Sequence, residues 1–170
     1  MPDDRAPGEL ETVRQLLLTA VLPNDTRVPE DRLGAWLPAA DRGEEAEVRG
    51  LRDALRATLG RDRPTDLAPW LDRHPLHAVL AADGRPVGLV PDDPSLVGRL
   101  LSAVVGAVAD GTWPRLRACP DCGYAFYDTS RNGSRTWCRM TKEDPSGRSC
   151  GSIAKARAKR ARDRLAAAEG

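Results

Sequence analysis

Four cysteines in the last third of the chain constrain its fold more than any other feature. Cys119 and Cys122 belong to a Cys-Pro-Asp-Cys-Gly turn, and Cys138 and Cys150 follow after fifteen and eleven intervening residues. Such a turn lets two thiolates converge on one ion, and Gly123 supplies a backbone conformation that a β-carbon would resist. Four thiolates complete the tetrahedral shell that a structural zinc prefers. The spacing therefore predicts one Zn²⁺ and no open catalytic position.

The alternative for these cysteines is four free thiols or two disulfides. The N-terminal residues lack the basic and apolar regions of a signal peptide, and there is no run of about 18 apolar residues. We therefore expect a cytoplasmic protein. In a reducing compartment, an even set of clustered cysteines favours a metal over disulfides. A redox role for the Cys-x-x-Cys pair is disfavoured, because no βαβ pattern surrounds it and two further cysteines accompany it.

Apolar residues recur at helical spacing in three long segments before the cysteines. They predict helices from Glu9 to Leu22, from Glu44 to Leu59, and from Ser95, as an N-cap, to near Gly111. Three tryptophans in this part of a chain poor in aromatic residues are expected in the core rather than around a ligand. They are Trp36, Trp70 and Trp113.

Two shorter segments predict a β-hairpin. Leu76–Ala81 and Arg85–Val90 flank Ala82-Asp83-Gly84, a suitable turn sequence. The predicted fold class is mainly α with a small β-hairpin. A helical N-terminal domain over residues 1–112 precedes a C-terminal treble-clef-like zinc finger over residues 113–170.

The finger is expected to have a very small core. Tyr124, Phe126 and Trp137 offer most of its large apolar surface, so metal binding should supply much of its folding energy. Cys150 precedes a helix predicted from Ser152 to Ala168, which would place the last ligand at the start of that helix.

Charge is distributed unevenly along the chain. Residues 111–170 contain 13 Lys and Arg against 6 Asp and Glu, whereas residues 1–110 contain 13 against 19. A basic segment joined to an acidic body indicates a polyanionic partner for the basic segment alone.

The C-terminal helix would carry basic residues on two faces. Lys155, Lys159 and Arg162 share one face, and Arg157, Arg160 and Arg164 lie nearly opposite. A stripe between them, expected to pack on the finger or the body, consists of Ala154, Ala158, Ala161 and Leu165. The candidate nucleic-acid contacts are Arg131, Asn132, Arg135, Arg139, Lys155, Arg157, Lys159, Arg160 and Arg164.

Both basic clusters also have a plain structural interpretation. The tail would then be a solvated, charge-rich helix, and Asn132-Gly133 would simply close a turn. Arg and Asn are nevertheless the side chains suited to guanine and adenine edges, so duplex DNA is the expected partner.

The run from Cys119 to Met140 resembles the CGNR zinc finger family of bacterial proteins. In that family a helical, stress-regulator-like domain called ABATE precedes the finger, and residues 9–110 resemble it in length and helix order. The resemblance implies zinc ligands at Cys119, Cys122, Cys138 and Cys150, and a role in DNA binding and transcription regulation. The Cys-Gly-Asn-Arg motif that gives the family its name is replaced here by Cys150-Gly151-Ser152-Ile153. The segment Thr141–Ser149 is longer than the family's usual gap before the last cysteine.

Catalytic motifs are not recognisable in the sequence. The chain has two histidines, His74 and His77, without a metal-ligand pattern around them, and it lacks a glycine-rich phosphate loop and a nucleophile elbow. We therefore expect a protein that is not an enzyme.

The sequence is compatible with two functions. The first is a zinc-binding transcription regulator whose finger and basic helix contact DNA. The second is a protein-interaction module in which the zinc is a structural clip and the basic helix docks on an acidic protein. No membrane partner is expected, and a homodimer and an unidentified small-molecule effector on the N-terminal domain are left open.

Overall fold

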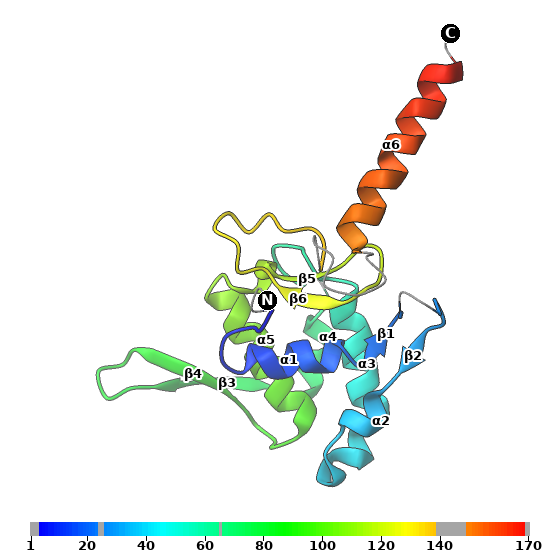
Figure 1. Cartoon of the computed structure of the whole chain (residues 1–170). Coiled ribbons are helices and arrows are strands. Elements are labelled where there is room, and N and C mark those ends of the chain that lie inside the picture. Colours follow the sequence, from blue (N-terminus) through cyan, green and yellow to red (C-terminus); the bar gives the residue numbers. More distant parts are fainter. Residues whose placement is uncertain (1–3, 24–25, 65, 139–148, 169–170) are drawn as a thin grey trace.

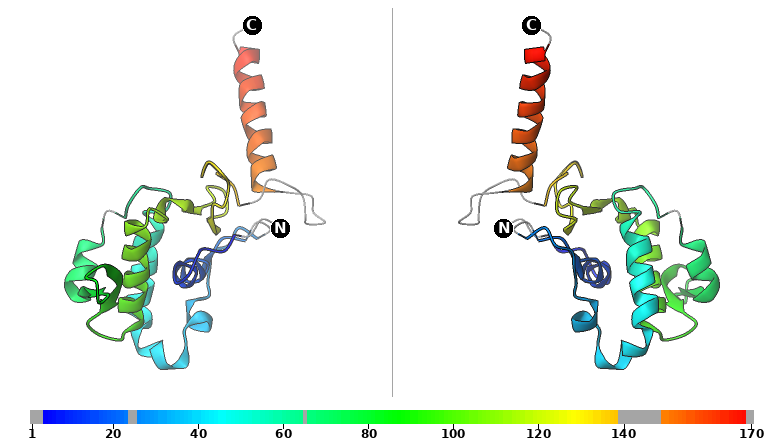
Figure 2. Two further views of the ribbon diagram at one scale, coloured as in Figure 1. Left: turned by 90° about the vertical axis from the view of Figure 1, so that its left-hand side faces the viewer. Right: turned by 90° about the vertical axis from the view of Figure 1, so that its right-hand side faces the viewer.

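A computed structural model describes residues 4–23, 26–64, 66–138 and 149–168 of the chain. The described part forms a helical body from which one long helix projects (Figure 1). Two side views show the same helix standing clear of the body (Figure 2). The molecule therefore consists of a packed part and a C-terminal helical extension.

Three helices form the centre of the body: α1 (Leu10–Leu17), α3 (Glu45–Arg56) and α5 (Leu96–Ala109). Each contacts the other two, so they enclose one core. Their buried apolar residues include Leu10, Val13, Leu16, Leu17, Val48, Leu51, Leu55, Leu96, Val97, Leu100, Leu101 and Val104. The helical periodicity is thus confirmed in all three segments. Ser95 is confirmed as an N-cap, since its hydroxyl accepts a hydrogen bond from the Gly98 amide at 3.0 Å.

The first helix ends at Leu17, earlier than the predicted end at Leu22. The Thr19 hydroxyl donates to the Leu16 carbonyl at 2.7 Å and accepts from Arg52 at 3.0 Å, which fixes a turn. Strand β1 (Ala20–Val21) then pairs antiparallel with β2 (Glu30–Asp31). The prediction was wrong here because the backbone N–H and C=O groups after the helix form hydrogen bonds with a strand further along the chain, in place of the bonds of a longer helix.

Short elements connect and cover the three central helices. They are α2 (Leu33–Trp36), the 3₁₀ helix η1 (Ala39–Glu44), α4 (Ala68–Arg73) and the 3₁₀ helix η2 (Trp113–Arg115). Trp113 is fully buried, and Trp36 and Trp70 pack against the core from its edge. The prediction that these three aromatic residues belong to the core is confirmed.

The predicted hairpin is present as β3 (Leu76–Leu80) and β4 (Pro86–Pro91), with Leu76 opposite Pro91. Its base rests on α5, where the Ser102 hydroxyl donates to the Leu89 carbonyl at 2.7 Å. Its far end extends away from the body (Figure 1) and exposes Leu80 and Val87.

A third strand pair links the body to the cysteines. In β5 (Leu116–Ala118) and β6 (Ala125–Tyr127), Leu116 lies opposite Tyr127. Alternate residues of β6 face opposite ways. Ala125 and Tyr127 join the core of the body, while Phe126 packs among the cysteines, with Tyr124 and Trp137 beside it. The expected aromatic core of the finger is confirmed, and its hairpin also packs directly on the body.

Two arginines inside the body are held by carboxylates. Arg14 donates from Nε and Nη2 to the two carboxylate oxygens of Glu11, at 2.7 and 2.6 Å. Arg52 donates from its two terminal nitrogens to the two oxygens of Asp31, both at 2.9 Å. The second pair clamps β2 to α3, and bidentate pairing of this kind is stronger and geometrically more specific than a single neutral hydrogen bond.

These pairs predict a loss of stability in acid. Burial tends to raise the pKa of Glu11, but hydrogen bonds from Arg14, Gln15 and the Ala6 amide outweigh it and lower the pKa from 4.5 to about 2. The hydrogen bond from Arg52 likewise lowers the pKa of Asp31 to about 2. Carboxylates with depressed pKa values stabilise the fold above their unfolded pKa, and this stabilisation disappears as the pH falls through the folded value.

We expect the free energy of unfolding to fall by about 2 kcal/mol between pH 4.5 and pH 2, after allowance for solvent screening. Chemical denaturation at a series of pH values measures it. The Glu11→Gln variant should be less stable at neutral pH and flatter across this window, whereas Glu9→Gln, at an exposed position, should follow the parent chain. A slope in Glu11→Gln as steep as in the parent would contradict the assignment.

The projecting helix is α6 (Cys150–Ala168). It begins at the last cysteine, two residues before the predicted start at Ser152. Ala158 and Ala161 are exposed, so the prediction that the alanine stripe packs on the finger or body was wrong for these two residues; Ala154 is half-buried, and the Leu165 side chain lies outside the described part of the structure. The reason is the direction in which the helix leaves Cys150, which carries it into solvent (Figures 1 and 2). None of the described helices combines the length and apolar character needed to cross a membrane.

Candidate metal centre

The first two cysteines lie on the tight turn between β5 and β6. The Gly123 amide donates to the Cys119 carbonyl at 2.8 Å, and the Cys119 amide donates to the Tyr124 carbonyl at 2.9 Å. Gly123 has a φ of +69°, a left-handed conformation that glycine adopts without a β-carbon penalty. The backbone therefore turns back on itself and places the Cys119 and Cys122 side chains on one side.

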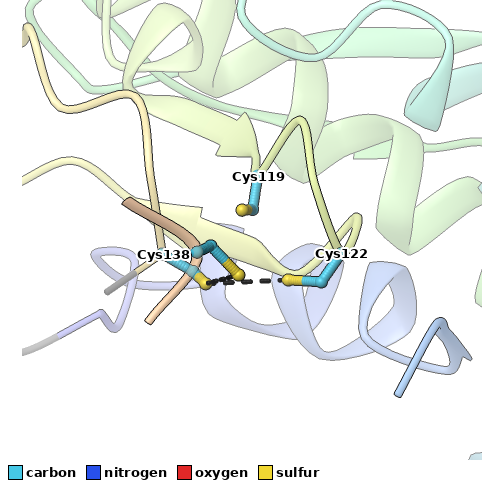
Figure 3. A group of neighbouring side chains, drawn as sticks. Cys119, Cys122 and Cys138 are labelled. Carbon is cyan, nitrogen blue, oxygen red and sulfur yellow. Dashed lines mark hydrogen bonds between the residues drawn. The ribbon is translucent and has the colours of Figure 1, made fainter. Parts of the chain in front are cut away.

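The other two cysteines come from separate parts of the finger. Cys138 follows the loop after β6, and Cys150 is the first residue of α6. In Figure 3 the labelled side chains of Cys119, Cys122 and Cys138 converge on one small volume. All four sulfur atoms lie within 4.8 Å of one another. Chain segments far apart in sequence thus meet at one four-sulfur cluster.

Sulfur separations in the cluster fit a tetrahedral zinc and do not fit disulfides. Cys122 Sγ lies 3.6 Å from Cys138 Sγ, and Cys138 Sγ lies 3.7 Å from Cys150 Sγ. Four sulfurs, each about 2.3 Å from a central zinc, are about 3.8 Å apart, whereas a disulfide requires about 2.05 Å. All four cysteines are unbridged and buried. These residues could hold one zinc ion, with every coordination position filled by sulfur.

The thiols of the cluster are electrostatically dependent on one another. Hydrogen bonds from the Cys122 and Cys138 side chains lower the pKa of Cys119. The same contacts, with burial added, raise the pKa of Cys138, and contact with Cys119 raises that of Cys122. The sulfurs alone therefore resist full ionisation, because each new thiolate meets the charge of its neighbours. A divalent cation removes this obstacle, and its binding releases protons.

The loop between β6 and Cys138 is built around a buried carboxylate. Asp128 accepts from the Ser130 amide at 2.9 Å and from the Arg135 amide at 2.7 Å, and it is fully buried. Arg115 donates to the carbonyls of Asp128 and Ser130, both at 2.9 Å. These contacts fix the path of the chain that delivers Cys138.

Arg135, one of the candidate nucleic-acid contacts, makes side-chain hydrogen bonds within the fold. Its guanidinium donates from Nε to the Trp137 carbonyl at 3.0 Å, from Nη1 to Asp4 at 2.5 Å, and from Nη2 to the Cys138 carbonyl. It also lies 4.5 Å above the centre of the Phe126 ring. All three nitrogens are therefore engaged within the fold, two with the segment that carries Cys138 and one with Asp4 near the N-terminus, and the side chain supports Cys138.

The other candidate nucleic-acid contacts that the structure describes fall into two exposed groups. Arg131 and Asn132 lie in a turn closed by a hydrogen bond from the Gly133 amide to the Ser130 carbonyl at 3.2 Å. The second group lies on α6 and consists of Lys155, Arg157, Lys159, Arg160 and Arg164. Arg139 lies outside the described residues. The structure thus separates the candidates into a short turn and a long helix.

Two arginines of the body contact the cysteine turn and were missed in the sequence. Arg56, on α3, donates to the Gly123 carbonyl at 3.0 Å, and Arg27 donates to the Asp121 carbonyl at 3.1 Å. Local motifs contain no signal for such contacts, since the partners are separated by 67 and 94 residues in the chain.

The histidines are not part of this centre. His74 is buried and its Nε2 lies 3.0 Å from Glu47, whereas His77 is exposed and pairs with Asp92 at the base of the hairpin. Among the described residues, the four cysteines are the group arranged to hold a metal ion.

The cluster, its buried sulfurs and its aromatic packing define a zinc-finger type of site. In agreement, residues 115–163 match the model of the CGNR zinc finger family, a range that contains all four cysteines and most of α6. No curated protein matches the chain.

Gly123 offers a test of how the turn is built. A β-carbon there would lie 2.9 Å from the Arg56 Nη2 atom in addition to the strain of the positive φ, so Gly123→Ala should destabilise the cysteine turn by about 1–2 kcal/mol. We expect faster zinc loss to a chelator, followed with a chromophoric zinc indicator. Gly133→Ala is the matched control, because its φ is also positive but its nearest contact is an ordinary 3.8 Å. Equal rates of zinc loss in the two variants would contradict this explanation.

Proposed function

We propose that the protein is a zinc-dependent transcription regulator in which α6 contacts duplex DNA. The observation that carries the proposal is the exposure of a basic helix that starts at a zinc ligand and points away from the body (Figure 1). The role is one of binding, and it needs no catalytic step. The arrangement of a cysteine turn on a hairpin, with the last ligand at a helix start, supports a treble-clef-like finger.

The shape of α6 supports docking in the major groove. Its 19 residues correspond to about 28 Å at 1.5 Å per residue, and a helix of ordinary diameter enters a groove about 12 Å wide. Zinc coordination by Cys150 fixes the first turn of the helix. The metal thus gives a projecting helix a defined origin and direction.

The distribution of side chains around α6 supports the same orientation. The exposed residues Ala158 and Ala161 form a stripe along α6. On one side of it lie Lys155, Lys159 and Arg162, and on the other lie Arg157, Arg160 and Arg164. With the small alanines towards the floor of the groove, the two basic sides would face the phosphates of the two strands. Alanine side chains can approach base edges and thymine methyl groups without steric conflict.

Charge separation within the chain favours this orientation over contact through the body. The first 110 residues carry more acidic than basic groups, so the body is repelled by the phosphate backbone while α6 is attracted. Arg157 makes a 3.3 Å contact with Asp121 but remains largely exposed, so it is still available to a phosphate.

Fluorescence anisotropy with labelled duplex DNA, repeated across a salt series, tests the proposal. We expect the logarithm of the affinity to fall linearly with the logarithm of salt concentration, as counterions are released from the phosphates. Chelation of zinc should abolish this binding. An affinity that does not change with salt, or absent binding by zinc-loaded protein at low salt, would reject DNA as the partner and favour an acidic protein docked on α6.

A further inference from the structure

A pocket lies where the N-terminal body meets the cysteine turn. Its volume is about 430 Å³, and it is bounded by the β1–β2 pair, by α3 and by the turn that contains Cys122 and Gly123. On the β1–β2 side, Val21 and Pro29 form an apolar part of the wall, and Glu30 and Asp31 add two acidic residues to it. The basic groups lie on the α3 side, where Arg52 and Arg56 enter the lining.

The two arginines of this pocket differ in whether a carboxylate neutralises their charge. Arg52 is compensated by the bidentate ion pair with Asp31 described above. Arg56 donates to two neutral acceptors, the Leu17 carbonyl at 2.7 Å and the Gly123 carbonyl at 3.0 Å. Among the described residues, none places a carboxylate within ion-pair distance of Arg56. Its charge is therefore partly buried without a counterion.

An uncompensated guanidinium in a partly buried position is costly, and a bound anion relieves that cost. Burial and the nearby charge of Arg52 lower the pKa of Arg56, while Asp53 raises it, which agrees with a cation lacking a close partner. Arginine remains charged in proteins, so the relief has to come from an anion and not from loss of the proton.

We propose that this pocket binds a small organic monoanion, a carboxylate attached to an apolar body, with Arg56 as the ion-pair partner. The carboxylate lies against the guanidinium, and the apolar part of the ligand covers Val21 and Pro29. A volume of about 430 Å³ falls within the range of small-molecule sites.

The lining also selects against other anions. Glu30 and Asp31 are part of the same pocket, so a dianion such as phosphate meets repulsion that a single carboxylate meets less strongly. A bare oxyanion also leaves the apolar wall in contact with water. The site therefore favours a ligand with one negative charge and a hydrophobic portion.

Through Arg56, such a ligand would contact a side chain that is bonded to both the helical body and the cysteine turn. The same guanidinium holds the end of α1 through Leu17 and the cysteine turn through Gly123. The binding proposal is independent of DNA binding by α6, and each of the two proposals can fail without the other.

The first experiment uses the unmodified, zinc-loaded protein. Titrations with 2-naphthoate, with its neutral analogue 2-naphthamide and with inorganic phosphate are followed by calorimetry and by amide chemical shifts. We expect 2-naphthoate to bind most tightly and to shift the amides of Val21, Arg56 and Gly123. Equal affinity for the amide or for phosphate, shifts confined to other regions, or no binding of 2-naphthoate into the millimolar range would overturn the proposal.

The second experiment removes the charge. Arg56→Met keeps an apolar stem of similar length, and it should weaken 2-naphthoate binding roughly tenfold or more because a charged hydrogen-bond partner is lost. Arg61→Met, at an exposed position shortly after α3, is the matched control and should bind like the parent chain. Zinc content and thermal melting verify the fold of both variants. Unchanged affinity in folded Arg56→Met would refute the ion pair, and if that variant does not fold, the comparison of naphthoate with naphthamide on the parent chain decides.

Discussion

Replacement of Cys138 by serine is expected to abolish tight zinc binding and to unfold the finger while the helical body persists. Structural zinc contributes apparent binding free energies of about 10–16 kcal/mol in zinc-finger peptides, and removal of one of four thiolates forfeits much of that. The finger's own core is small, with Phe126 buried among the cysteines and Tyr124 and Trp137 beside them, so the segment from Cys138 onward depends most on the metal. The core enclosed by α1, α3 and α5 contains no cysteine and should survive.

Zinc stoichiometry after dialysis, together with limited proteolysis, measures this result. The Cys138→Ser chain should retain well below one zinc and be cleaved between β6 and α6, while fragments of the body resist the protease. Thr136→Ser, an exposed change two residues away, should behave like the parent. A Cys138→Ser protein that keeps one zinc at unchanged affinity would show that the cluster is not the metal site.

Reversal of charge on α6 is expected to lower the affinity for duplex DNA by about 100-fold or more at moderate salt. The triple variant Lys159→Glu, Arg160→Glu, Arg164→Glu changes both basic sides of the helix and leaves the Arg157–Asp121 contact in place. Each lost phosphate contact also reduces the salt slope by about one, so the slope should become shallower by about three.

The matched control carries the same change in net charge on the body, as Arg42→Glu, Arg61→Glu, Arg63→Glu at exposed positions. This control should lose far less affinity, and both variants should retain one zinc per chain. Equal losses in the two triple variants would indicate that net charge, and not α6, governs the interaction. No loss in the α6 variant would exclude the helix as the contact.

Much of the helical body could be predicted from sequence because its helices are amphipathic. Val48, Leu51 and Leu55 recur at the period of a helix. Apolar residues at this spacing share one face of the helix, and that face is the one that is buried in the core. The β1–β2 pair could not be predicted in this way. Two residues per strand give no detectable alternation, and the pairing depends on contacts between Arg52 and Asp31, 21 residues apart.

The metal ligands were accessible to sequence reasoning, whereas the function of the surrounding arginines was not. Cysteine is a specific metal ligand, and the Cys-Pro-Asp-Cys-Gly turn motif contains two of the four cysteines. Arg135 has the same local sequence character as Arg131, yet one is tied to Asp4 across the fold and the other is exposed. Which arginine supports the fold and which remains free depends on partners distant in the chain.

The alanine stripe of α6 illustrates the opposite error. Its apolar period correctly indicated a helix, but periodicity does not specify what lies opposite the stripe. The exit direction from Cys150 left Ala158 and Ala161 exposed, and the proposed DNA contact uses the basic sides that flank them.

Zinc content is the most direct test of the central claim that four cysteines form one structural metal centre. Elemental analysis of protein purified without added metal or a metal-binding tag should be combined with a thiol count before and after chelation. We predict one zinc per chain and four thiols that become reactive only on chelation, because the sulfurs are buried and coordinated. Protein without metal whose cysteines are freely reactive or oxidised would contradict the metal centre and the role proposed for α6.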